Sequence, residues 1–149
     1  MKTLQKQLST FYYSVLVLAV LFAVVGGYFF KENNLVITNN LIIDVLKSII
    51  IVYMLIIIPL SLKIFSTKVK KIAQIDDENE KFAKYLSIAK VRIMLIADIV
   101  FIGIFAFFIL QKTSIQTPQY DFFYIAGIGA ITLIFCQPTK NRIENDLFN

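Results

Sequence analysis

The chain has no histidine and no tryptophan, and its one cysteine is Cys136. Without histidine it lacks the commonest general base and metal ligand at neutral pH. A single cysteine cannot form a disulfide within the chain, and Cys136 has no acid or base beside it in the sequence, so a redox role is not expected. Charged residues make up 17% of the 149 positions, compared with about 25% in soluble domains.

Glycine and proline are also scarce, with five and three copies. The glycines never adopt the GxGxxG or GxxxxGK spacing of phosphate-binding loops. No nucleophile has a histidine to activate it, and the lysines and carboxylates that could replace histidine lie mostly in polar segments. The sequence therefore predicts no catalytic residue, no cofactor and no metal site, and it favours a protein that is not an enzyme.

Apolar residues, by contrast, make up 58% of the chain, and the mean hydropathy is +0.73. This composition, in a chain short enough for one domain, predicts an all-α integral membrane protein over residues 1–149. Apolar stretches predict transmembrane spans at 11–30, 41–65, 93–111 and 118–137, joined by a connection over 66–92 and followed by a tail over 138–149. Thr117, Pro118 and Pro138 set the limits of the fourth span. A signal peptide is the alternative for the first stretch, but its apolar run is long and no cleavage motif follows it.

Basic residues are distributed unevenly between the two sides of these spans. Twelve of the 15 lie before the first span, around the second connection or after the fourth span: Lys2, Lys6, Lys63, Lys68, Lys70, Lys71, Lys81, Lys84, Lys90, Arg92, Lys140 and Arg142. The positive-inside rule then places both termini and residues 66–92 in the cytoplasm, as in an antiparallel four-helix bundle. This distribution also accounts for the net charge of +5 without a nucleic-acid partner. Lys68, Lys70 and Lys71 are expected to contact anionic lipid headgroups.

The third helix is predicted to begin well before its membrane span. Asp77 and Glu80 form a capping pattern, and apolar residues recur at helical spacing beyond them. The helix should therefore start near Asp77 and project into the cytoplasm before it enters the membrane.

Asp98 is the one acidic residue well inside the predicted third span. A carboxylate at the bilayer centre costs about 2.5–3.5 kcal/mol on insertion scales, so such residues face the bundle interior and mark candidate sites. The candidate intramembrane polar site comprises Asp98, Lys63, Ser61, Tyr12 and Tyr13. It is either a structural anchor, which we favour because no second acid continues a relay, or a route for protons, cations or a small solute.

Small residues recur along one face of the first predicted helix and again in the fourth. The set is Ala19, Ala23, Gly27, Ala126, Gly127, Gly129 and Ala130. Small residues allow close backbone approach between membrane helices. We therefore expect the first and fourth helices to contact each other through this small-residue seam, or the seam to form a homo-oligomer.

Two further local features lie in the second helix. Pro59 should free the carbonyl of Leu55 and kink the helix, with Ser61 placed to satisfy a freed group. Asp44 and Lys47 are one turn apart and are expected to pair near the outer interface.

The segments Lys81 to Tyr85, Arg92 to Ile93 and Phe135 to Thr139 resemble parts of small uncharacterised four-span proteins of bacterial inner membranes. The resemblance implies an inner-membrane location but no activity and no site residues. Together these features favour an accessory, assembly or scaffold subunit that contacts lipid and either copies of itself or another membrane subunit. The alternative is a minimal transporter or channel that uses Asp98.

Overall fold

The computed structural model describes residues 1–33, 39–109 and 118–148. Within these ranges the chain is all-α and contains no strand. The helices are α1 (Lys2–Asn33), α2 (Asn40–Ala73), α3 (Glu78–Ile109), α4 (Pro118–Phe135) and α5 (Lys140–Phe148). The first three are long and apolar enough to cross a membrane, and α4 with α5 adds a fourth candidate if the pair, bent by 70°, is counted as one span. The all-α fold and the transmembrane character of these helices agree with the sequence.

Helices α2 and α3 run well past the predicted spans, so the connection over 66–92 is nearly all helical. Helix α3 begins where the capping pattern predicts, because the Asp77 side chain accepts a hydrogen bond from the Asn79 amide at 2.9 Å. Pro118 is the first residue of α4, as predicted, whereas Thr117 lies outside the described residues. The predicted tail over 138–149 contains α5.

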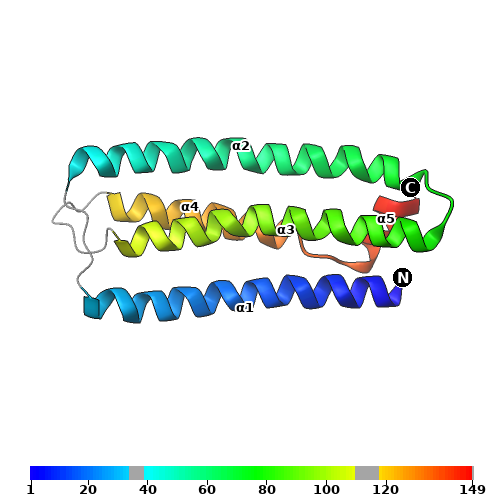
Figure 1. The fold of residues 1–149 in the computed structure, drawn as a ribbon, viewed down its shortest axis with the longest axis horizontal. Coiled ribbons are helices and arrows are strands. Elements are labelled where there is room, and N and C mark those ends of the chain that lie inside the picture. Colours follow the sequence, from blue (N-terminus) through cyan, green and yellow to red (C-terminus); the bar gives the residue numbers. More distant parts are fainter. Residues whose placement is uncertain (34–38, 110–117, 149) are drawn as a thin grey trace.

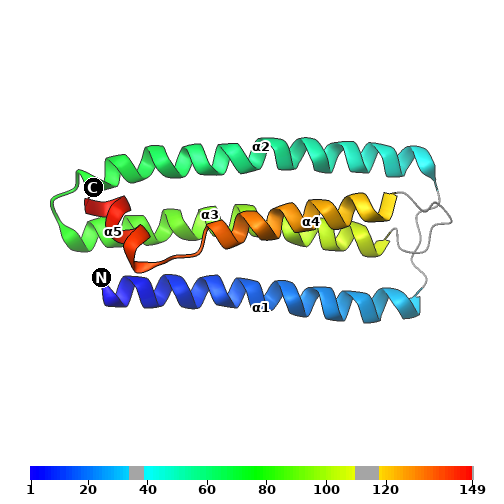
Figure 2. The same ribbon diagram turned by 180° about the vertical axis from the view of Figure 1, so that it is seen from behind.

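Helix α3 is the centre of the molecule, because it packs against α1, α2 and α4. Helix α2 also contacts α4 and α5. Both ribbon views show α3 and α4 lying between α1 and α2 (Figures 1 and 2). In the described chain, α1 shares at most marginal contact with α2 and with α4. These contacts differ from the closed ring of an up-and-down bundle, in which helices adjacent in sequence pack together.

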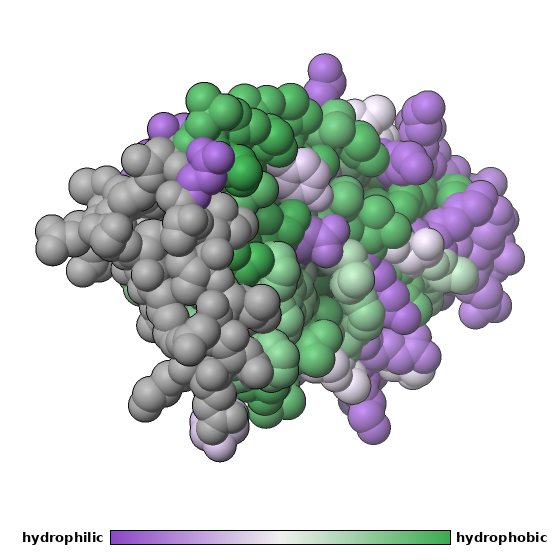
Figure 3. Space-filling model, turned by 60° about the vertical axis from the view of Figure 1, so that its left-hand side comes forward, coloured by the Kyte–Doolittle hydropathy of each residue, from purple (hydrophilic) through white to green (hydrophobic). Residues whose placement is uncertain are grey.

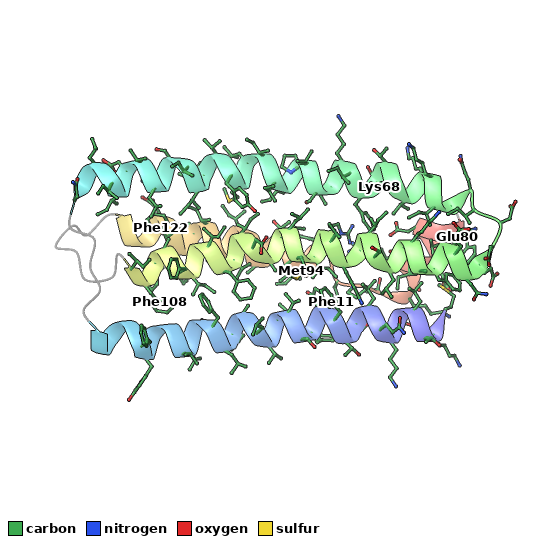
Figure 4. All side chains as sticks on the ribbon, viewed as in Figure 1. Phe11, Lys68, Glu80, Met94, Phe108 and Phe122 are labelled. Carbon is green, nitrogen blue, oxygen red and sulfur yellow. The ribbon has the colours of Figure 1, made fainter. Side chains whose placement is uncertain are left out.

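Two of the small residues, Gly27 of α1 and Gly129 of α4, pack against α3, whereas Gly127 of α4 faces open space. A Cβ atom added at Gly27 would lie 3.4 Å from the Phe108 ring, and Figure 4 shows Phe108 between α1 and α3. On α4, a Cβ atom at Gly129 would lie 3.0 Å from side-chain carbons of Ile99 and Val100. Within the chain, the predicted contact between the first and fourth helices is therefore wrong, because α3 is the neighbour of both.

The surface changes character along the helices. Figure 3 shows apolar residues over the middle of the molecule and polar residues toward the end with the α2–α3 turn. Many large apolar side chains on the outer faces of α1 and α2 are more than half exposed, including Val24, Val25, Leu41 and Leu55. We call the end with the α2–α3 turn, the N-terminus and α5 the basic end (Figure 1).

Candidate functional site

Asp98 lies on α3, half-buried, with Tyr53 of α2 as a polar neighbour within electrostatic range. The register of α2 and α3, which the short turn after Ala73 joins, explains why Asp98 and Tyr53 are neighbours. Asp98 is 20 residues after Glu78, the first residue of α3, and Tyr53 is 20 residues before Ala73, the last residue of α2. Among the described residues Asp98 forms no ion pair. Tyr53 is not among the predicted site residues, although its distance from the α2–α3 turn matches that of Asp98.

The other members of the candidate polar site lie elsewhere. Ser61 is buried, and its hydroxyl donates to the carbonyl of Ile58 at 2.8 Å. We expected the Ser61 hydroxyl to satisfy a group that Pro59 frees, the carbonyl of Leu55, but it bonds to Ile58 instead. Helix α2 continues through Pro59 as one helix. Lys63 is exposed and lines a cavity at the basic end.

The two tyrosines are placed by α1. Their ring centroids are 5.4 Å apart in an edge contact. Tyr12 is buried and has Cys136 as a neighbour, whereas the exposed Tyr13 hydroxyl accepts a hydrogen bond from the Gln137 side chain at 3.1 Å. The five predicted residues thus have different neighbours in the structure, and the polar neighbour of Asp98, Tyr53, is outside the predicted set.

The main cavity of the basic end lies between α2, α3, the end of α4 and α5, and it has a volume of about 1520 Å³. We call it the basic cavity. One described acidic side chain, that of Asp146, lines the basic cavity. Five basic side chains line it as well: Lys63, Lys70, Lys81, Arg92 and Arg142. The Arg92 guanidinium carbon lies 3.7 Å from the centre of the Phe65 ring. This is a cation–π contact, which suits a planar guanidinium.

Helix α5 forms one wall of the basic cavity. Ile143 and Leu147, four residues apart, are buried on its inner face. The Tyr85 hydroxyl of α3 donates to the Asp146 carboxylate at 2.7 Å. Tyr85 lies outside the predicted span, and burial together with Asp146 raises the pKa of its hydroxyl, so the hydroxyl remains the donor. These contacts hold α5 against the helices.

Arg142 closes the turn between α4 and α5. Its Nη1 donates to the carbonyls of Phe135 and Gln137, at the end of α4 and just beyond it. A cation at this position also complements the negative end of the α4 dipole. The sequence predicts only a tail in this region, because a single pair of apolar residues one turn apart, Ile143 and Leu147, is weak evidence for a helix.

The lysine cluster expected to contact lipid is divided by the helical twist of α2. Lys70 lines the basic cavity, whereas Lys68 and Lys71 line a smaller cavity of about 330 Å³ between α2 and α3. All three side chains are exposed. Basic charge is therefore available on two faces of the basic end.

At the opposite end of the helices, Lys47 of α2 forms an ion pair with Asp121 of α4. The predicted pair with Asp44 is wrong. Asp44 is exposed, and its backbone carbonyl accepts from the Ser48 hydroxyl at 2.8 Å. Lys47 reaches across to the neighbouring helix because Asp121 stands in the first turn of α4.

No known protein family matches the chain, and neither does a curated protein or a solved structure. Over the described ranges no group of three His, Cys, Asp or Glu side chains could hold a metal ion. The candidate functional features of the described chain are therefore Asp98, the outer face of α1 and the basic cavity.

Proposed function

We propose that this chain is a four-span protein of the bacterial inner membrane, with both termini in the cytoplasm, that serves as a non-enzymatic accessory, assembly or scaffold subunit. The three long apolar helices support a membrane location. The basic residues gathered at the end with the α2–α3 turn support the orientation. The resemblance to small four-span bacterial proteins belongs to the same proposal.

The outer face of α1 is the feature that supports the subunit role. Thr3, Gln7, Thr10 and Ser14 recur every three or four residues and are all exposed. They form a polar stripe on a helix whose principal neighbour within the chain is α3. Hydroxyl and amide side chains commonly join membrane helices through hydrogen bonds. Thr3, Gln7 and Thr10 precede the span over 11–30 and Ser14 lies near its start, so we propose that the polar stripe receives another membrane subunit at the cytoplasmic boundary.

A single-cysteine crosslinking experiment tests this role. In a Cys136→Ala background, Ser14→Cys is labelled with a photoreactive maleimide in native membranes, and the adduct is identified by mass spectrometry. The matched control is Val20→Cys, because Val20 is 63% exposed and lies about 120° around the helix from Ser14. We expect position 14, and not position 20, to give an adduct with a different membrane protein that also co-purifies in mild detergent. Equal labelling from both positions with no co-purifying protein would contradict the proposal.

The second candidate function is transport of protons, cations or a small solute through Asp98. The half-buried carboxylate supports it, because Asp98 has Tyr53 nearby and no ion pair among the described residues. An adduct of the chain with itself, and a flux in proteoliposomes that Asp98→Asn abolishes without unfolding the protein, would favour this function over the subunit role.

A further inference from the structure

The basic cavity has two chemically different halves. Toward the basic end it is lined by the charged groups of Lys70, Arg92 and Arg142. Toward the middle of the molecule it is lined by Ile58 and Leu62 of α2 and by Phe135 of α4, which is 70% exposed. At about 1520 Å³ it exceeds the roughly 300–1,000 Å³ of ordinary small-molecule pockets. Its ligand should therefore be large and amphiphilic.

Arg92 lines the basic cavity and carries a side-chain nitrogen without a partner. Its Nε is buried and has no hydrogen-bond acceptor among the described atoms. Buried donors in folded proteins are almost always paired, so an orphaned one needs an explanation. The guanidinium is already fixed against the Phe65 ring, and an arginine fixed in this way is well suited to bind a phosphate oxygen.

A second guanidinium lies close to the first. Arg92 and Arg142 are both within electrostatic range of the Cys136 thiol and of the Tyr85 hydroxyl, so the two cations converge on one region from α3 and α5. Asp146, the acidic residue of the lining, already accepts from Tyr85. Because this hydrogen bond leaves Asp146 charged, the region has two positive charges, those of Arg92 and Arg142, against one described negative charge, and it stays net positive.

We infer that the basic cavity binds an anionic phospholipid. Arg92 and Arg142 hold the phosphate of the headgroup, and Lys63 and Lys70 add to the attraction. The acyl chains leave along Leu62 and Phe135 toward the membrane. This differs from general attraction of lysines to a charged membrane surface, because it requires one open cavity with two arginines and an apolar side. A free phosphate ion would use the same arginines but would gain nothing from the apolar half, which is why the lipid is favoured.

The full-length protein in a nonionic detergent provides the test. Native mass spectrometry measures the dissociation constant for phosphatidylglycerol, for phosphatidylcholine and for inorganic phosphate. We expect phosphatidylglycerol to bind at least tenfold more tightly than phosphatidylcholine, and inorganic phosphate to compete poorly. Equal binding of the two lipids would overturn the inference. Full displacement of phosphatidylglycerol by millimolar phosphate would also overturn it, because the ligand would then be a free anion.

Two substitutions on α2 form the matched pair. Lys63→Gln removes one charge inside the basic cavity, and Lys68→Gln removes one charge outside it; both side chains are exposed. Neutralising one cavity charge should weaken phosphatidylglycerol binding about fivefold, and Lys68→Gln should change it less than twofold. Arg92→Gln should weaken binding by more than Lys63→Gln. If Arg92→Gln unfolds the protein, the comparison of Lys63 with Lys68 still decides, and equal losses from those two variants would contradict a specific site.

Discussion

Gly103 marks a close approach of α3 to α4, and its replacement by alanine is a direct test of the packing. A Cβ atom at Gly103 would lie 2.8 Å from the backbone nitrogen of Ala126 and 2.9 Å from its Cα and Cβ atoms. Ordinary van der Waals contact begins near 3.4 Å, so the helices must separate by about 0.6 Å. No side-chain rotation can relieve the overlap, because the closest atoms belong to the backbone.

The expected cost follows from two opposing effects. Overpacking a close interface costs about 1–3 kcal/mol. Alanine regains up to about 1 kcal/mol over glycine through helix propensity. Gly103→Ala should therefore lower the free energy of unfolding by about 1–2 kcal/mol. Gly127→Ala is the matched control, since a Cβ atom there would meet nothing within 4 Å, and it should leave stability unchanged or raised.

Cys136 supplies the assay. It is the one cysteine of the chain and is 2% exposed, so maleimide labelling reports unfolding. We would titrate mixed micelles with sodium dodecyl sulfate and fit the labelled fraction for the wild type and both variants. If Gly103→Ala and Gly127→Ala gave the same unfolding free energy, the close packing of α3 on α4 through Gly103 would be refuted.

Three further predictions concern other contacts. Asp121→Asn should lower the free energy of unfolding by up to about 1 kcal/mol, because it breaks the ion pair with Lys47. Exchanging the two residues (Lys47→Asp with Asp121→Lys) should restore most of this free energy in a double-mutant cycle. No recovery would argue against the pair. Tyr85→Phe should raise hydrogen–deuterium exchange in α5 and leave exchange in α4 unchanged, because it removes the hydrogen bond to Asp146. A hydrogen bond to a charged acceptor is worth about 1.5–3 kcal/mol. Unchanged exchange in α5 would show that apolar packing alone holds this helix. Asp98→Asn should keep the thermal unfolding temperature within a few degrees if the side chain is a structural anchor that needs only hydrogen bonding, and a large drop would contradict that reading.

The sequence contained much of the information on individual helices. Apolar run length predicted the three long helices, and Asp77 and Pro118 marked where α3 and α4 begin. These signals are local, since capping and span length depend on residues within one or two turns. The extension of α2 to Ala73 was missed because Lys70 and Lys71 were counted as loop, although basic residues suit the last turn of a helix.

The sequence does not indicate which helices pack against each other. Small residues at Ala23, Gly27 or Gly129 show where a backbone can approach, but not which helix will do so. Gly103, which has the shortest contacts of the described glycines, is not among the predicted seam residues. Helix α5 was missed because it has nine residues and two buried apolar positions, so the apolar pattern does not repeat often enough to indicate a helix.

The position of α1 has a consequence for biosynthesis. Helix α1 is synthesised before α2, yet its principal neighbour α3 is made only after α2 is complete. Since α1 and α2 share at most marginal contact in the described chain, the newly inserted pair has little to hold it together, and each helix must be stable in lipid by itself. We therefore expect a translation intermediate that ends before α3 to leave α1 unattached in the bilayer, open to capture by another subunit before the chain is finished.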